Sequence, residues 1–568
     1  MTDAPGRRTR AAVLAAALAA VALTGGGQAA PAQATTSART VAPVLTCPAL
    51  SGVDFSGVPG APATILSATL VPAGTNGVSY EYCDVKGVVA PQVQFELQLP
   101  TRTYLGRYLQ EGCGGYCGNV GVSASPAASA GCVPLNTGTF AVGQDDEGHI
   151  GGGATDVWAI GDPQSKVDFG YRSEHVFALA AKAVQASFYG APPAKSYYDG
   201  CSDGGREALM EAQRYPTDFN GILAGAPAQN QAALNAIEEP YEATLDFTPS
   251  GQVILPASKL TMLHAAVIAA CATPGLRDGT IEDPRDCAFQ PSSLQCPANV
   301  DAAGCLTTAQ VDVVNKIYNG AVSRTGEHLY TGGEPKGTEN LWQGILIPPD
   351  GQGQAAIFFT KIGSGYLRYV GQWVARPQAT VNTNAYTVQN LLSYRDGLGR
   401  IYDATDPDLT AFYRAGGKLI QWAGWADQFI PPTTSTTYYQ AVLDTMGARR
   451  VGEFYRLYMF PGVGHCGGGY GPNQFDLLTP LVDWVESGTT PSRVVASAAT
   501  YSRPVYPYPT RVRYAGQGDV NSAASYVPYQ PATRYDDHFA WAGAPFRSGY
   551  ELWCRFDGTR MVCTARSS

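Results

Sequence analysis

The chain has 568 residues, of which 45% are hydrophobic and 15% charged, and its formal net charge is −9. A chain of this length can bury a large core and exceeds the usual size of one compact domain, so we expect one core that carries a large insertion. Because no basic run occurs outside the N-terminus, the charge pattern excludes nucleic acid and anionic membranes as partners and leaves a small neutral or weakly acidic ligand open.

The first 34 residues have the pattern of a secretory signal peptide. Three arginines between positions 7 and 10 precede an apolar run over residues 11–23, and Ala32-Gln33-Ala34 offers a small-residue cleavage site. The apolar run is shorter than the about 20 residues that a membrane-spanning helix needs. We therefore expect export, with cleavage near Ala34, and no membrane anchor.

Strand and helix patterns alternate along much of the chain. Residues 35–90 are rich in Pro, Gly, Ala and Ser and predict an extended segment that leads into the core. Apolar and polar residues then alternate over residues 93–99, as in a half-buried strand that opens the sheet. Further strand-like runs precede Gly200 and Gly225 and follow Gly417, with apolar helix faces between them. The alternation predicts an α/β fold whose mainly parallel sheet is covered on both sides.

A glycine-rich run, Gly112–Gly118, follows the strand-like residues 104–110. Such a run is typical of an ordinary turn, or of a loop whose backbone N–H groups bind an oxyanion. In the second case Gly114 or Gly115 is the donor.

The segment Tyr197–Gly205 carries the Gly-x-Ser-x-Gly pattern around Ser202. A strand-like run precedes it, and a helix is expected to follow over Arg206–Tyr215, stopped by Pro216. In such an elbow the glycines permit tight backbone angles, and the serine hydroxyl projects at the N-terminus of the helix. The pattern predicts Ser202 as a nucleophile and the backbone N–H of Asp203 as an oxyanion donor.

Between residues 229 and 395 the alternation fails, and Gly, Pro, Asn and four cysteines are frequent. We interpret this stretch as an insertion, and as a lid over a pocket rather than an inert decoration. The core is then expected over residues 35–228 and 396–568.

Asp427 lies in a loop after the strand-like residues 418–422, where a carboxylate would hold an imidazole in its working tautomer. Three rivals precede that strand in a polar turn and are expected to cap a helix. They are Asp403, Asp406 and Asp408.

His465 is the best candidate for the base that takes the proton of Ser202. It lies in a glycine-rich loop, residues 460–469, directly after the strand-like residues 454–459. The chain order serine, acid, histidine, which α/β-hydrolases share, excludes the histidines before the serine. The other later histidines are expected to be surface or core residues: His264, His328 and His538.

All 13 cysteines follow the predicted cleavage site, so disulfides are expected in the exported protein. Cys201 directly precedes Ser202 and Cys466 directly follows His465, so a hydrogen bond between serine and histidine would bring the two sulfurs within bonding range. That bond would clamp nucleophile and base in register. Short loops favour four further pairs: Cys47–Cys83, Cys271–Cys287, Cys296–Cys305 and Cys554–Cys563.

Three motifs resemble the tannase and feruloyl esterase family: the Gly-Cys-Ser-x-Gly-Gly elbow, the Gly-x-x-Asp segment that ends in Asp427, and the Gly-His-Cys-Gly-Gly-Gly loop. The resemblance runs from the Cys47 region to Cys563. It implies an α/β-hydrolase core with an inserted lid, the disulfide between the cysteines that flank serine and histidine, and cleavage of esters of aromatic acids.

Two features depart from the family. The resemblance implies a structural calcium in the lid, but the corresponding loop, residues 271–284, is one residue shorter and matches only Asp278 among three carboxylate ligands. Calcium takes six to eight oxygens, so we expect this loop to bind it poorly and no cofactor to be required. Extra cysteines are the second departure, and we expect Cys113 or Cys117 to pair with Cys132.

Together these features predict a secreted serine carboxylic ester hydrolase that acts on small aromatic esters, feruloyl esters first and galloyl esters second, drawn from plant cell-wall polymers. A terephthalate monoester hydrolase would need a cation in the lid, and Arg368, near Tyr366 and Trp373, is either that cation or a surface residue. A non-catalytic binding protein on the same fold is the remaining alternative, against which the complete serine, aspartate and histidine set argues.

Overall fold

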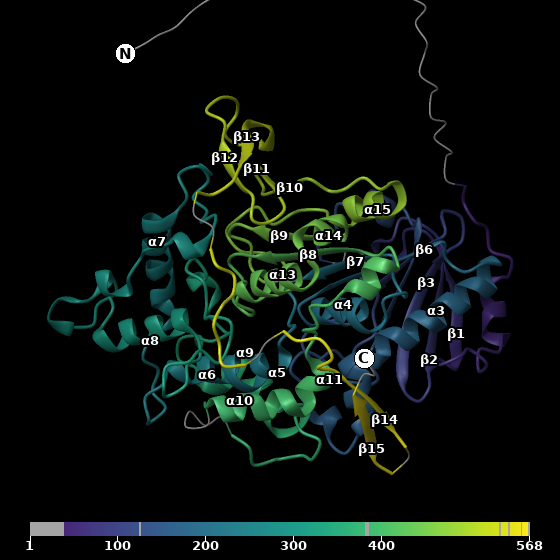
Figure 1. Ribbon diagram of the computed structural model, residues 1–568, viewed down its shortest axis with the longest axis horizontal. Coiled ribbons are helices and arrows are strands. Elements are labelled where there is room, and N and C mark those ends of the chain that lie inside the picture. The colour runs from purple at the N-terminus through teal and green to yellow at the C-terminus, as the bar shows by residue number, and fades with distance from the viewer. Residues whose placement is uncertain are drawn as a thin grey trace, which may run out of the picture. The chain divides into compact units, whose positions relative to one another are not determined.

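A central sheet of nine strands has the order β1-β2-β3-β5-β4-β6-β7-β8-β9 (Figure 1). The pairs from β5 to β9 are parallel, and β1, β2, β3 and β5 pair antiparallel. The predicted α/β fold with a mostly parallel sheet is confirmed. The strands are β1 Ala63–Val71, β2 Tyr82–Val89, β3 Val93–Pro100, β4 Arg107–Glu111, β5 Phe140–Asp145, β6 Lys195–Cys201, β7 Gly221–Gly225, β8 Lys418–Gly424 and β9 Tyr455–Phe460.

The computed structural model describes residues 39–123, 127–380, 386–532, 535–543, 546–557 and 559–565. The predicted signal peptide and its cleavage site near Ala34 lie outside them. No helix in these ranges has the length and apolar character that a membrane crossing requires.

The N-terminal part of the sheet differs from its prediction. Where composition predicted only an extended segment, β1 and β2 pair antiparallel from Ala63 opposite Val89 to Val71 opposite Tyr82, with a register shift between Ile65 and Ser67. The prediction was wrong because β1 lies at the edge of the sheet, so apolar side chains such as Leu66 and Leu70 are exposed and the alternation is weak.

Two apolar cores lie on the two faces of the sheet, because successive side chains of a strand point to opposite sides. Tyr198 packs in the core that includes α3, α4 and α13, and Tyr197 packs in the core that includes α15. Helices thus cover both faces. Their bounds are α3 Ser173–Tyr189, α4 Asp203–Arg214, α13 Thr433–Met446, α14 Ala448–Phe454 and α15 Leu478–Ser487; two short helices, α1 Val133–Asn136 and α2 Pro163–Val167, precede them.

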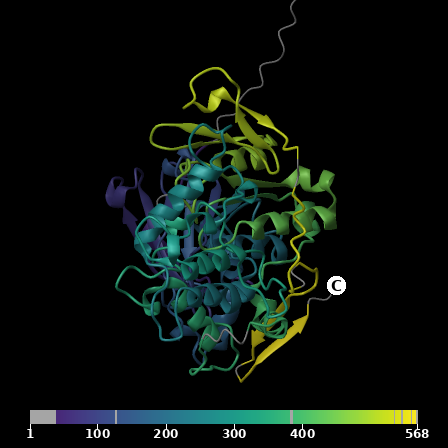
Figure 2. The same cartoon turned by 90° about the vertical axis from the view of Figure 1, so that its left-hand side faces the viewer.

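Residues 229–395 separate β7 from β8, two strands that pair directly, and add no strand to the nine-stranded sheet. Helices of this segment pack around a core of their own, with Leu263, Val314 and Trp342 at its centre. They lie to one side of the sheet in Figure 1 and come toward the viewer in Figure 2. The α-helices between β7 and β8, together with the segment η5 that joins α5 to α6, are α5 Gln231–Ala233, η5 Leu234–Glu238, α6 Glu239–Leu245, α7 Leu260–Cys271, α8 Thr308–Asn319, α9 Phe358–Gly365, α10 Val388–Tyr394, α11 Arg400–Tyr402 and α12 Thr410–Arg414.

The C-terminal part forms three two-stranded hairpins. The last hairpin contains the disulfide Cys554–Cys563, and Tyr171 of the core donates a hydrogen bond to the carbonyl of Cys554. Covalent and hydrogen bonds therefore tie the end of the chain to the core. The strands are β10 Val494–Ser497, β11 Ser502–Val505, β12 Arg511–Tyr514, β13 Tyr526–Tyr529, β14 Leu552–Phe556 and β15 Met561–Ala565.

Candidate active site

Ser202 occupies a sharp turn between β6 and α4. Its φ of 68° and ψ of −118° lie in a region that a residue with a side chain rarely adopts. The glycines around it are required by close backbone contacts: a Cβ at Gly200 would lie 2.4 Å from the carbonyl oxygen of Gly204, and one at Gly205 would lie 2.2 Å from that of Gly225. The sequence therefore forces a strained elbow that presents Ser202 at the N-terminus of α4.

His465 and Asp427 are hydrogen-bonded in loops after β9 and β8. The Nδ1 atom of His465 lies 2.9 Å from Oδ2 of Asp427. The other carboxylate oxygen, Oδ1, accepts the backbone N–H groups of Phe429 at 2.9 Å and Ile430 at 3.0 Å. With Asp427 fully buried, these bonds fix the carboxylate, and the carboxylate in turn fixes the imidazole.

The rival acids are engaged elsewhere. Asp403 accepts the backbone N–H of Ala232, and Asp406 and Asp408 accept backbone N–H groups within their own turn. None of the three contacts His465, so the loop after β8 alone brings a carboxylate to the imidazole in the described part of the chain.

A disulfide joins Cys201 to Cys466 across 265 residues of sequence, with a Cα–Cα distance of 5.8 Å. Because these cysteines are the direct neighbours of Ser202 and His465, the bond holds the elbow and the histidine loop together. Ser202 and His465 line the same cavity as a result. The four short-loop disulfides expected from spacing are also present.

The glycine-rich run after β4 lies beside the elbow. Gly114 and Gly115 line the cavity together with Ser202 and Asp203. The loop is fastened to α4 where the N–H of Gly204 donates to the carbonyl of Cys113 at 2.8 Å. The structure thus brings together every residue that the sequence singled out as an oxyanion donor.

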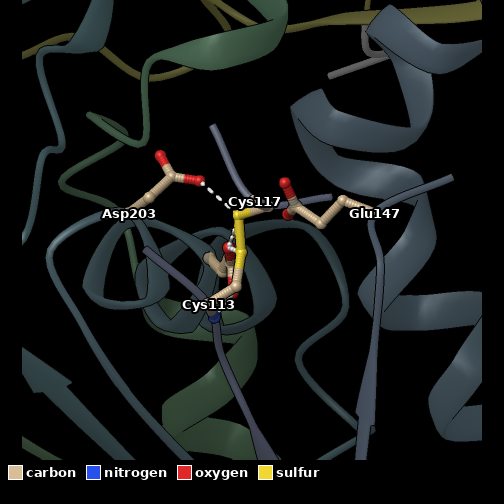
Figure 3. A group of neighbouring side chains, drawn as sticks. Cys113, Cys117, Glu147 and Asp203 are labelled. Atoms are coloured by element: carbon tan, nitrogen blue, oxygen red, sulfur yellow. Dashed lines mark hydrogen bonds between the residues drawn. A yellow bond between two sulfur atoms is a disulfide. The ribbon is translucent and has the colours of Figure 1, made fainter. Parts of the chain in front are cut away.

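The pairing expected for the extra cysteines was wrong. Cys113 bonds to Cys117 within the glycine-rich loop (Figure 3). Cys132 is a buried free cysteine. Cys132 lies in the apolar core on the α15 face of the sheet, away from the loop. Sequence spacing could not show this separation, because the two segments are close in sequence and distant in the fold.

The cavity has a volume of about 300 Å³. Its apolar lining comes from the core and from the inserted segment, and the Phe429 ring lies 4.8 Å from the His465 ring and 5.4 Å from the Phe358 ring. An aromatic slot therefore leads to the imidazole. The apolar lining residues are Ala228, Leu234, Phe358, Ile362, Phe429 and Ile430.

Three polar residues in this lining were not predicted. Gln231, Asn235 and Glu239 are spaced by four along one helical segment, and each is at least nine-tenths buried. Asn235 donates its Nδ2–H to Glu239 at 2.5 Å, and burial raises the pKa of Glu239 to about 8. The i, i+4, i+8 spacing was the available signal. Arg368 is absent from the cavity lining and instead donates its Nε–H to the carbonyl of Ala379.

The loop at residues 271–284, which corresponds to the family's calcium loop, pairs its carboxylates with arginine side chains. Asp278 lies 2.8 Å from the Nε atom of Arg503 and accepts the backbone N–H of Thr280. Asp283 lies 2.7 Å from guanidinium nitrogens of both Arg285 and Arg511. A guanidinium group thus occupies Asp278, the one carboxylate of the loop that matches a calcium ligand, and the residues present do not fit that ion.

Known ester hydrolases resemble this chain over most of its length. Residues 76–528 match the family described as tannase and feruloyl esterase. A probable feruloyl esterase of Arthroderma benhamiae is 33% identical over 76% of this chain and 81% of its own. Mono(2-hydroxyethyl) terephthalate hydrolase of Piscinibacter sakaiensis is 29% identical over 83% and 87%. The crystal structure of feruloyl esterase B from Aspergillus oryzae superposes with a TM-score of 0.71 and 28% identity, over 82% of this chain and 97% of that one. The chain is a carboxylic ester hydrolase and belongs to the tannase and feruloyl esterase family.

Proposed function

We propose that the chain hydrolyses esters of hydroxylated aromatic acids, feruloyl esters foremost, with Ser202, His465 and Asp427 as its catalytic residues. The observation that carries the proposal is the meeting of Ser202 and His465 in one aromatic-lined cavity, joined through the Cys201–Cys466 disulfide. Residues 229–395 would act as the lid, because they supply the wall of that cavity that faces the catalytic residues.

In the proposed mechanism, Oγ of Ser202 attacks the ester carbonyl carbon while Nε2 of His465 takes the hydroxyl proton. Asp427 keeps the proton on Nδ1 and stabilises the imidazolium that forms. The N–H groups of Asp203 and of Gly114 or Gly115 bind the oxyanion. His465 then protonates the leaving alcohol. A water molecule, deprotonated by His465, attacks the acyl-enzyme, and the acid leaves as Ser202 regains its proton.

The lining of the cavity supports an aromatic and uncharged acyl group. Phe358 and Phe429 offer ring faces and edges, against which a flat acyl group packs well. No lysine or arginine is among the described residues that line the cavity. The carboxylate of a terephthalate monoester would therefore lack a cation in the cavity, which disfavours that substrate.

Galloyl esters are the second candidate because of the row of polar side chains in the cavity lining, Gln231, Asn235 and Glu239. Oε1 of Gln231 and Oδ1 of Asn235 are buried and have no hydrogen-bond partner among the described residues. Phenolic hydroxyl groups are donors that such acceptors could engage, at a benefit of about 1 kcal/mol each. The row favours ring hydroxyl groups, which feruloyl and galloyl esters both carry.

A panel of methyl ferulate, methyl gallate and a terephthalate monoester tests this ranking. We expect kcat/KM to fall in that order, with the monoester at least about tenfold below methyl ferulate, because its charge is buried without a partner. A methyl 3,4-dimethoxycinnamate control keeps the ring and removes the hydroxyl donor. The proposal fails if the terephthalate monoester is the best substrate, or if the folded enzyme hydrolyses none of the panel.

We also propose that the enzyme acts outside the cell. Six disulfides support this location, since such bonds persist in oxidising compartments. N-terminal sequencing of the protein recovered from the medium should begin just after Ala34. Retention of active, uncleaved protein in the cell would contradict export.

A further inference from the structure

The Cys113–Cys117 disulfide closes a small ring around the glycines of the oxyanion loop. Figure 3 shows the bond between the two sulfurs. The two cysteines are four residues apart, and Gly114 and Gly115 lie between them in the sequence. Both glycines line the cavity beside Ser202. A bond at this place constrains the backbone that carries a proposed oxyanion donor.

The two glycines are held to different degrees by their surroundings. Gly115 has a φ of +66° and packs on Gly153, where a Cβ would lie 2.5 Å from the carbonyl oxygen. The following residue, Tyr116, is anchored through its N–H to that same carbonyl at 2.7 Å. Gly114 has no atom within 4 Å of the place where a Cβ would stand. Packing therefore leaves that side of Gly114 open. The constraint on it comes from the turn itself, in which its carbonyl accepts the N–H of Cys117 at 3.1 Å and the disulfide joins the two ends.

Glu207 of α4 contacts the same loop at Cys113. Its Oε2 atom accepts the phenolic O–H of Tyr198 at 2.6 Å and the backbone N–H of Cys113 at 3.2 Å. Its Oε1 atom contacts the sulfur of Cys113 at 2.9 Å. The side chain is 1% exposed, and burial, followed by the charge of Asp203, raises its pKa. The carboxyl group thus connects the first cysteine of the ring to the central sheet.

Side chains around the carboxyl group of Glu207 are bonded to one another or to a neighbouring arginine. Donor atoms of Cys113, Cys117, Glu147, Asp203 and Glu207 lie within 4.8 Å of one another, a spacing that would suit a metal ion. The two sulfurs are bonded to each other, and Asp203 binds the Nε–H of Arg206 at 2.7 Å. We therefore interpret the cluster as a mechanical support.

We propose that the Cys113–Cys117 disulfide and Glu207 act together as a positioning brace for the oxyanion loop, so that they stabilise the transition state and leave substrate binding unchanged. The proposal rests on the proposed serine esterase function. A backbone donor that shifts by about 1 Å costs about 100-fold in rate, and complete loss of one oxyanion donor costs about 100- to 1,000-fold.

The test compares three variants with the wild type. C113S/C117S removes the brace disulfide, E207Q changes the support, and C296S/C305S removes a disulfide of the inserted segment that does not line the cavity. For each we would measure kcat and KM on methyl ferulate and on 4-nitrophenyl acetate, the Ki of an arylboronic acid that forms a tetrahedral adduct with Ser202, and the Kd of ferulate.

In C113S/C117S we expect kcat and boronate affinity to fall together by about 10- to 100-fold, while the Kd of ferulate stays within about twofold. E207Q should show a smaller loss with the same signature, about three- to tenfold, because its amide oxygen still accepts the N–H of Cys113. C296S/C305S should keep wild-type kinetics. A merely structural role would weaken boronate and ferulate binding alike.

The brace is overturned if C113S/C117S retains the kcat of C296S/C305S, or if boronate and ferulate affinity fall in parallel. Stoichiometric metal together with free thiols at positions 113 and 117 of the purified enzyme would also overturn it. Failure of the proposed function looks different, because the wild-type enzyme itself would then hydrolyse neither ester and form no boronate adduct at Ser202.

Discussion

The two walls of the cavity are built in different ways. On the core wall, Ser202 and His465 follow strands of the central sheet, and the Cys201–Cys466 bond joins them. On the wall from the inserted segment, helices supply Asn235, Glu239 and Phe358, and neither disulfide of that segment lines the cavity. The difference suggests that covalent rigidity is concentrated where atoms react, and that helices present the side chains that choose the acyl group.

The largest effect should come from the core wall. In D427N the amide can still accept the N–H groups of Phe429 and Ile430, but it no longer holds a proton on Nδ1 of His465. We expect kcat on methyl ferulate to fall by about 10,000-fold with little change in KM. The matched control is D408N, at an exposed aspartate that caps a turn, which should keep full activity. A loss of less than about tenfold in D427N would remove Asp427 from the catalytic set.

The wall from the inserted segment should respond to pH through Glu239. Burial raises the pKa of this carboxyl from 4.5 to about 8, so the folded state keeps a proton that the unfolded state releases. Because the folded state binds more protons in this window, the free energy of unfolding falls as pH rises from about 5 to about 8. E239Q should remove part of that fall, on the order of 2–4 kcal/mol, as measured by urea unfolding across this range.

An exposed glutamate of the same segment provides the control for that measurement. E327Q alters a side chain on a surface turn and should leave the pH dependence unchanged. If wild type and E239Q lose stability in parallel between pH 5 and pH 8, Glu239 is not a protonated residue of the cavity wall.

The smallest effect concerns selection of the acyl group. F358A removes a ring that packs edge-to-face on Phe429, and we expect KM for methyl ferulate to rise by about tenfold while kcat changes by less than about threefold. An acetyl ester serves as the matched control, since its acyl group is too small to reach the ring. Equal losses on both esters would mean that the helical wall contributes to the chemical step.

Much of the core could be predicted from local pattern. The alternation over residues 93–99 identified β3, and the glycines around Ser202 identified the elbow, because each pattern reflects backbone geometry that neighbouring residues impose. Edge strand β1 was missed because its outer side chains are exposed. Gln231, Asn235 and Glu239 escaped prediction because their role depends on facing a cavity whose other wall comes from distant segments.

Disulfide pairing shows the same limit. Pairs that close short loops, such as Cys296–Cys305, and the pair beside Ser202 and His465 followed from position in the sequence. The pairing of Cys113 with Cys117 did not, because Cys132 also follows nearby in the sequence and only the fold separates it from the loop.

Trapping the acyl-enzyme tests the central claim most directly. Wild-type enzyme would be mixed with methyl ferulate, quenched in acid within milliseconds, digested and analysed by mass spectrometry, with S202A as the control. We expect a feruloyl adduct on the peptide that contains Ser202 and none in S202A, whose kcat should be lower by about a million-fold. Feruloyl transfer to another residue, or hydrolysis by S202A at the wild-type rate, would contradict that claim.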